Sequence, residues 1–170
     1  MRIKFLLLPA CAVLMIACNN SSDKKENKED TSVNKMNHDS LQHMLANNSN
    51  IPALPAVPEG AKVFFKNMKN GDDVDALLMV EMGVEKMRVD TAGPVAAGSG
   101  HHHLFIDAED SLSAGTGVPK DASHMHFGRG ETEAGLKLSA GTHKLTLQFA
   151  DGLHRSYGGK LSATITVNVK

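Results

Sequence analysis

The strongest constraint on the fold is the regular alternation of apolar and polar residues near the C-terminus. Apolar side chains stand at every second position from Leu161 to Val169, with Ser, Thr and Asn between them. The run from His143 to Phe149 alternates in the same way. Because successive side chains of a strand point to opposite faces, this two-residue period predicts β-strands with one buried face.

Shorter runs of the same kind predict more strands at 63–65, 74–82, 102–107 and 134–138. The second of these is apolar on both faces and is therefore expected to be central in its sheet. Turn residues separate the runs: Asn70-Gly71-Asp72 and Ser139-Ala140-Gly141 predict hairpins, and Asp151-Gly152 is expected to end a strand. Together these features predict an all-β domain, an antiparallel, immunoglobulin-like β-sandwich of about six or seven strands.

The first residues have the pattern of an export signal. Arg2 and Lys4 give a positive start, and the apolar run up to Ala17 is too short to span a bilayer as a mature helix. The run ends in Met15-Ile16-Ala17-Cys18, which resembles the lipobox of bacterial lipoproteins. That resemblance implies cleavage after residue 17 and lipidation of Cys18, so that acyl chains anchor the protein to a membrane of the bacterial cell envelope. An ordinary secretory signal is the alternative.

Composition divides the remaining chain into two parts. Residues 18–59 are rich in Asn, Ser, Lys, Asp and Glu, and the prolines lie close together near the end, which predicts a disordered tether or flexible linker. Residues 60–170 carry the strand pattern and are numerous enough for one compact domain.

Charge and cysteine content exclude several classes of function. The formal net charge of −1 gives no basic surface for nucleic acid. Signal cleavage would remove Cys11 and lipidation would use Cys18, which leaves no disulfide, cysteine nucleophile or thiolate ligand. A glycine-rich loop between a strand and a helix, as a nucleotide site requires, is absent from the sequence.

Histidine carries the main functional signal, because seven of the nine histidines lie between His101 and His154. Two tight groups stand out, His101-His102-His103 and His124-Met125-His126, and each is a His-x-His pair on one face of a strand. Imidazole is a common ligand of zinc and copper. The sequence therefore predicts a Cu or Zn site, with these ligands: His101, His103, His124, His126 and, from a later loop, His154.

The neighbours of these histidines predict how each one faces. Leu104 and Ile106 share a face with His102, so His102 is expected to be partly buried, whereas His101 and His103 face outward or line a cleft. Asp107 or Glu131 is placed to bind the metal or to orient an imidazole. His143 is assigned a structural role, either packed on the core or hydrogen-bonded to a turn.

Three segments resemble an exported bacterial family catalogued as domain of unknown function 4399. They are Gly98–Asp107, His126–Glu133 and Ala140–Leu147, followed by the final strand. The family often has a further histidine where Tyr157 stands here, and usually has Gln at the position of Glu131. The resemblance implies an exported β domain and leaves its function open.

Three functions follow from this pattern. The first is a non-catalytic, lipid-anchored domain that binds Cu or Zn in the periplasm or at the cell surface. The second is a metal-dependent enzyme with an open coordination position that activates water. The third is an interaction module of the envelope whose histidines are structural. The sequence identifies no protein partner.

Overall fold

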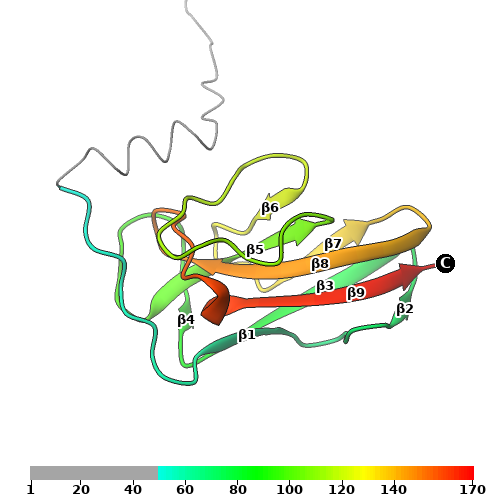
Figure 1. Cartoon of the computed structure of the whole chain (residues 1–170), viewed down its shortest axis with the longest axis horizontal. Helices are drawn as coiled ribbons and strands as arrows, with labels where there is room; N and C mark the ends of the chain where they lie inside the picture. Colours follow the sequence, from blue (N-terminus) through cyan, green and yellow to red (C-terminus); the bar gives the residue numbers. More distant parts are fainter. Residues whose placement is uncertain (1–49) are drawn as a thin grey trace, which may run out of the picture. The chain divides into compact units, whose positions relative to one another are not determined.

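The computed structural model describes residues 50–170, which form two β-sheets packed face to face (Figure 1). The predicted export signal, Cys18 and most of the predicted linker lie outside the described residues. One sheet has three antiparallel strands in the order β1 (Lys62–Phe65), β3 (Leu77–Glu85), β7 (Glu133–Lys137). The prediction of an all-β sandwich is confirmed.

The larger sheet has the order β2 (Asp73–Val74), β9 (Ser162–Val169), β8 (Gly141–Ala150), β5 (Ser99–Ile106), β4 (Arg88–Val89). A sixth strand, β6 (His124–His126), also pairs with β5. A short 3-10 turn, η1 (Gly159–Leu161), precedes β9. Among the described residues, no helix is long and apolar enough to cross a membrane.

The path of the chain is that of an immunoglobulin-like sandwich. The chain goes from β1 in the smaller sheet to β2 in the larger one and back to β3. It then crosses to β4, β5 and β6 in the larger sheet, returns for β7, and crosses again for β8 and β9. Such crossings bring strands that are distant in sequence together and bury the apolar face of each sheet against the other.

Two predicted hairpins are crossings between the sheets instead. The turn at Ser139-Ala140-Gly141 joins β7 of the smaller sheet to β8 of the larger one. The turn at Asn70-Gly71-Asp72 does form, with a positive φ of 88° at Gly71, but it leads from β1 to β2 of the other sheet. The reason is that turn residues fix a local reversal, while burial against both sheets decides where the next strand goes.

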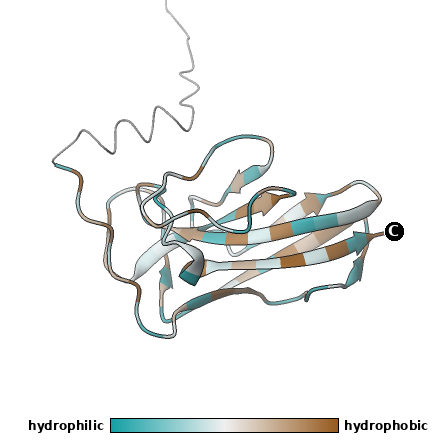
Figure 2. Ribbon diagram, in the orientation of Figure 1, coloured by the Kyte–Doolittle hydropathy of each residue, from teal (hydrophilic) through white to brown (hydrophobic). Residues whose placement is uncertain are grey.

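The main core lies between the two sheets and draws on alternate residues of each. Figure 2 shows apolar bands alternating with polar ones along β8 and β9, as the two-residue period predicts. Fully or nearly fully buried side chains come from both sheets: Val63, Val80, Met82, Leu136, Leu104, Leu145, Leu147, Phe149 and Val167.

A second, smaller apolar cluster covers the other face of the larger sheet. It contains Phe105, Val118 and Ala150, with Ala108 and Leu112 packed against them. The long connection between β5 and β6 supplies three of these residues and so covers the outer face of β5. As a result β5 is buried on both faces along almost its whole length.

The chain just before residue 60 also contacts the sandwich. Leu54 and Val57 pack against the main core, and the guanidinium Nη1 of Arg155 donates to the carbonyl oxygen of Pro52 at 2.8 Å. Part of the segment assigned to the linker thus lies on the domain. The boundary at residue 60 stays a prediction.

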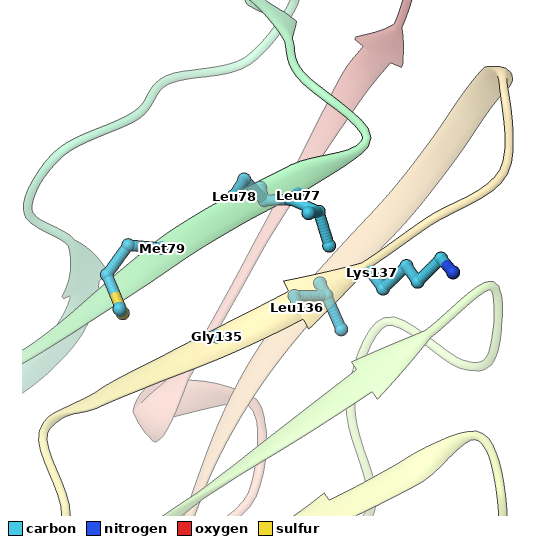
Figure 3. A pocket seen from close by; sticks show the side chains of 6 residues that line it. All are labelled: Leu77, Leu78, Met79, Gly135, Leu136 and Lys137. Atoms are coloured by element: carbon cyan, nitrogen blue, oxygen red, sulfur yellow. The ribbon is translucent and has the colours of Figure 1, made fainter.

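The smaller sheet leaves an apolar strip open to solvent. As predicted, β3 is the central strand of its sheet, but on its outer face Leu77 is 73% exposed and Met79 is 51% exposed. Figure 3 shows these side chains beside Gly135 and Lys137 of β7, where they line a pocket. The sheet therefore buries only one of the two apolar faces that the sequence gives this strand.

Candidate metal centre

Four histidines from three parts of the chain meet on the outer face of the larger sheet. His101 and His103 come from β5, and His126 of β6 stands opposite His103 in the antiparallel register. His154 reaches the same place from the loop that follows β8. The structure thus brings together four of the five predicted ligands.

The ring nitrogens of the four histidines converge. Nε2 of His101 lies 3.0 Å from Nε2 of His103, and Nε2 of His126 lies 3.0 Å from Nε2 of His154. One ligand atom from each of His101, His103 and His126 falls within 4.8 Å of the others. Two close pairs facing one another form a compact set of nitrogen donors.

The spacing of the rings suits a single small cation. Their centroids are 4.7 to 6.0 Å apart, the longest separation being that of His103 and His154. An ion bound tetrahedrally at about 2 Å by four Nε2 atoms would place the ring centroids about 5 Å apart. His101, His103 and His126 already meet this spacing, whereas His154 would have to come closer to His103 to bind the same ion.

Burial differs sharply within the cluster. His101 and His103 are 0% and 1% exposed, whereas His126 is exposed and His154 is half-buried. His101 and His103 were predicted to face outward or to line a cleft. They lie on the predicted face of β5, but both side chains are buried. They do point away from the main core, but the rings of His126 and His154 pack against them on that face.

This burial keeps the imidazoles neutral. Loss of solvation lowers the pKa of His101 to about 3 and that of His103 well below its usual range, and the neighbouring imidazoles add to both shifts. Burial also lowers the pKa of His126 and His154, with smaller contributions from nearby charges. Neutral imidazole is the form that binds a metal ion, so the cluster does not need to lose protons first.

Gly128 lies directly against the His126 ring, which occupies the space that a side chain at residue 128 would fill. A Cβ atom at this position would overlap Cε1 and Nε2 of His126 and would come within 3.2 Å of Cβ of Ala92. Only glycine leaves room for the imidazole here. The Gly-Arg-Gly run that begins after Phe127 indicates close packing or a tight turn, but this contact with His126 was not predicted from the sequence.

A buried ion pair fixes the loop that carries His154. The carboxylate of Asp151, which is fully buried, accepts hydrogen bonds from the backbone N–H of Leu153 and from the N–H and guanidinium of Arg155. Between these two contacts His154 adopts a left-handed φ of 63°. The turn aims the imidazole at His126. The roles of Asp151 and Arg155 in this turn were not predicted from the sequence.

His124 lies apart from the cluster. It stands opposite Phe105 in the register, with ring centroids 4.6 Å apart. Its Nδ1 is 2.7 Å from Asp121 Oδ1, and its Nε2 is 3.2 Å from Glu109 Oε1. Carboxylates thus occupy both ring nitrogens, so the structure does not bring this fifth predicted ligand to the other four.

His102 points into the main core, as predicted. It is fully buried against Phe149, with ring centroids 5.0 Å apart. Neither ring nitrogen has a hydrogen-bond partner among the described residues, and burial lowers the pKa of this histidine to about 4. The side chain faces the opposite side of β5 from the cluster and takes no part in it.

His143 has the hydrogen-bonding role that the sequence predicts. Its Nδ1 lies 2.7 Å from Asp107 Oδ2, and this contact raises its pKa. Its Nε2 lies 3.2 Å from Ser139 Oγ and 3.0 Å from the Ser139 carbonyl oxygen. A serine–histidine–aspartate order resembles a hydrolase triad, but a nitrogen that donates to a carbonyl cannot accept the serine proton. The group therefore acts as a clamp between β5 and β8.

Of the two carboxylates expected near the metal, Asp107 is used elsewhere, whereas Glu131 lies near enough to His126 for its charge to act on the pKa of that ring. Asp107 accepts from His143 and from the backbone N–H of Lys144. Glu131 accepts from the backbone N–H of Arg129. Within residues 50–170, no carboxylate is hydrogen-bonded to any of the four clustered rings.

Fold and cluster together define a class: an immunoglobulin-like β-sandwich with a four-histidine cluster on the outer face of its larger sheet. The chain belongs to the family described as Domain of unknown function (DUF4399), whose model matches residues 80–170 and so includes the whole cluster. No curated protein matches the chain.

Among solved structures, the chain is similar to the fibronectin(III)-like modules of CbhA from Clostridium thermocellum. The TM-score is 0.37 with 13% sequence identity, over 64% of this chain and 96% of that one.

Tyr157 stands where the family often has histidine. Its side chain is buried in the main core, and its hydroxyl donates a hydrogen bond to the Ser99 carbonyl oxygen at 2.7 Å. That position lies outside the cluster.

Proposed function

We propose that this chain is a non-catalytic, lipid-anchored protein of the bacterial cell envelope whose β domain binds one Cu or Zn ion. The observation that carries the proposal is the convergence of four imidazoles, with two Nε2 pairs each at 3.0 Å. A single histidine is usually structural, but four neutral rings whose Nε2 atoms meet in two close pairs form a donor set for a metal ion.

The donor chemistry narrows the choice of metal. Cysteine is absent from residues 50–170, so every strong donor near the centre is an imidazole nitrogen. Imidazole suits Zn and Cu, whereas carboxylate and carbonyl oxygens suit Mg and Ca. Five of the six ring separations lie between 4.7 and 5.1 Å, which suits the tetrahedral binding that Zn prefers.

The anchor rests on the sequence. The lipobox resemblance at Met15-Ile16-Ala17-Cys18 supports export and lipidation of Cys18. Lipidation would place the domain in the envelope, where metal availability differs from that of the cytoplasm. Radiolabelled palmitate incorporation that is lost in Cys18→Ala would support the anchor, and unchanged incorporation would contradict it.

Metal titration of the full chain tests the proposal. The chain, produced without a histidine tag and solubilised in mild detergent, is titrated with Zn(II) and with Cu(II), and bound metal is quantified after dialysis. We expect one ion per chain with a Kd below about 10 μM, which corresponds to about −7 kcal/mol. His101→Ala/His103→Ala should abolish this binding.

Two controls make the result specific. His38→Ala/His43→Ala removes the histidines that precede the domain, and His124→Gln alters the one beside Phe105; both should retain one ion per chain. Binding weaker than 10 μM for both metals, or unchanged stoichiometry in His101→Ala/His103→Ala with a folded domain by circular dichroism, would contradict the proposal.

A metal-dependent enzyme is the second candidate, because the exposed side of His126 leaves the centre accessible. Three histidines and an open position are the ligand set of catalytic zinc. That chemistry also needs a general acid or base, and among the described residues no carboxylate is hydrogen-bonded to the cluster. Turnover of model esters or of superoxide by the loaded protein, absent in His101→Ala/His103→Ala, would establish the enzyme instead.

A further inference from the structure

The cluster consists of an inner and an outer pair with different surroundings. The inner pair, His101 and His103, is fully buried on a central strand. The outer pair, His126 and His154, is partly open to solvent. An ion bound by all four would thus have one side in the protein and one side facing water.

The inner pair lacks the outer contacts that strengthen metal ligands. Nδ1 of His101 and Nδ1 of His103 are both buried and have no hydrogen-bond partner among the described residues. A metal-binding histidine normally donates this second ring N–H to a carboxylate, carbonyl or water, and losing that partner typically lowers metal affinity 10- to 100-fold. The inner pair alone is therefore a weak ligand set.

The outer pair stands on short supports at the solvent side of the centre, outside the main core. β6 has only three residues and is joined to the larger sheet through β5, and His126 is at its end. His154 stands at the tip of a turn that Asp151 and Arg155 hold at its base. Neither residue belongs to β5 or to the main core, so displacing these two rings from the ion would leave the packing of both unchanged.

We propose that the centre exchanges its ion by ligand substitution through the outer pair, so that the domain carries metal to an acceptor instead of keeping it permanently. The inference rests on the proposed metal binding. An incoming ligand with imidazole, thiolate or other strong donors displaces His154 and then His126, while His101 and His103 still hold the ion. The ion is transferred without a free intermediate, and its charge and oxidation state do not change.

Kinetics of transfer to a chelator test this mechanism. The full chain loaded with one Zn(II) is mixed in a stopped-flow instrument with excess 4-(2-pyridylazo)resorcinol, which changes colour on binding zinc. We expect the observed rate to rise in proportion to chelator concentration. His154→Ala should load with one ion and release it about tenfold faster or more, because lost affinity appears mainly in the dissociation rate.

Matched variants separate this mechanism from general loosening. His154→Gln and His126→Gln should both speed transfer, whereas His124→Gln, on the same strand as His126 but outside the cluster, should transfer at the wild-type rate.

Two results would overturn carriage through the outer pair. One is a rate independent of chelator concentration, which means the ion leaves only after the domain opens. The other is a wild-type rate in both His154→Gln and His126→Gln. If the wild-type chain fails to load with zinc or copper at all, the proposed function fails at that earlier step and this inference falls with it.

Discussion

Acidification should destabilise the metal-free domain through three buried histidines of one strand, His101, His102 and His103. Burial lowers the pKa of His101 to about 3, that of His102 to about 4 and that of His103 well below its usual range, whereas in the unfolded chain each returns to about 6.5. The unfolded state therefore binds more protons. The stability that these groups contribute is fully present above pH 6.5 and is lost as the pH falls below it.

The size of the loss follows from the same values. At pH 5, about 1.5 pH units below the unfolded pKa, each imidazole that stays neutral in the fold costs about 2 kcal/mol of stability, since one pH unit corresponds to about 1.4 kcal/mol. His101 and His102 together give a loss of about 4 kcal/mol between pH 7 and pH 5, and His103 adds to the loss in the same direction. A domain of this size has about 5 to 15 kcal/mol in total, so the effect is large enough to approach unfolding.

Urea unfolding in EDTA at pH 7 and pH 5, followed by circular dichroism, measures this loss. His102→Leu isolates one group without touching the cluster. It should lose about 2 kcal/mol less than the wild type between the two pH values. At pH 7 it should be more stable by about 1–3 kcal/mol, because a buried ring with no hydrogen-bond partner is replaced by an apolar one. A total wild-type loss under about 2 kcal/mol, or the same loss in His102→Leu, would refute the reasoning.

Two further predictions concern residues that position histidines. Gly128→Ala should weaken Zn(II) affinity about tenfold or more by displacing the His126 ring, and isothermal titration calorimetry of this variant against the wild type measures it; equal Kd values would show that the ring moves aside freely. Asp107→Asn should lower the pKa of His143 toward 6.5, as followed by NMR titration of the ring proton, because the carboxylate raises it in the wild type. In the wild type, the contact of Asp107 with His143 should stabilise the fold below pH 6.5, and this stabilisation should be lost as the pH rises through the folded pKa of His143. An unchanged pKa in Asp107→Asn would show that the carboxylate does not cause the shift.

The sequence predicted which side each histidine of β5 would take, because alternation alone determines the face. His102 turned toward the core and His101 and His103 turned away from it. Alternation does not determine how far along the neighbouring strand a partner lies. In the observed register His126 meets His103 while His124 is carried on to Phe105, so two histidines on one face of β6 have different surroundings.

The burial of the inner pair could not be predicted from the sequence for a related reason. Facing away from the main core normally means facing water, and the connection between β5 and β6 looked like a polar loop. Leu112 and Val118, widely spaced within it, pack with Phe105, which shares a face of β5 with His101 and His103. Isolated apolar residues in a loop show no regular spacing in the sequence. Their packing on the outer face of the larger sheet is therefore seen only in the folded chain.

The cluster and the core lie on opposite faces of β5, so they should respond separately to substitution. Leu104 is fully buried between the sheets, and Leu104→Ala should cost about 2–5 kcal/mol through lost burial and the cavity left behind. The neighbouring His103 faces the other way, so a Leu104→Ala domain that still folds at low temperature should bind one Zn(II) with a Kd within about threefold of the wild type. His103→Ala should show the reverse, with weaker metal binding and a smaller loss of stability than Leu104→Ala. If folded Leu104→Ala lost the ion, core packing would determine the ring positions through β5. The cluster would then not be independent of the core, although the two lie on opposite faces of the strand.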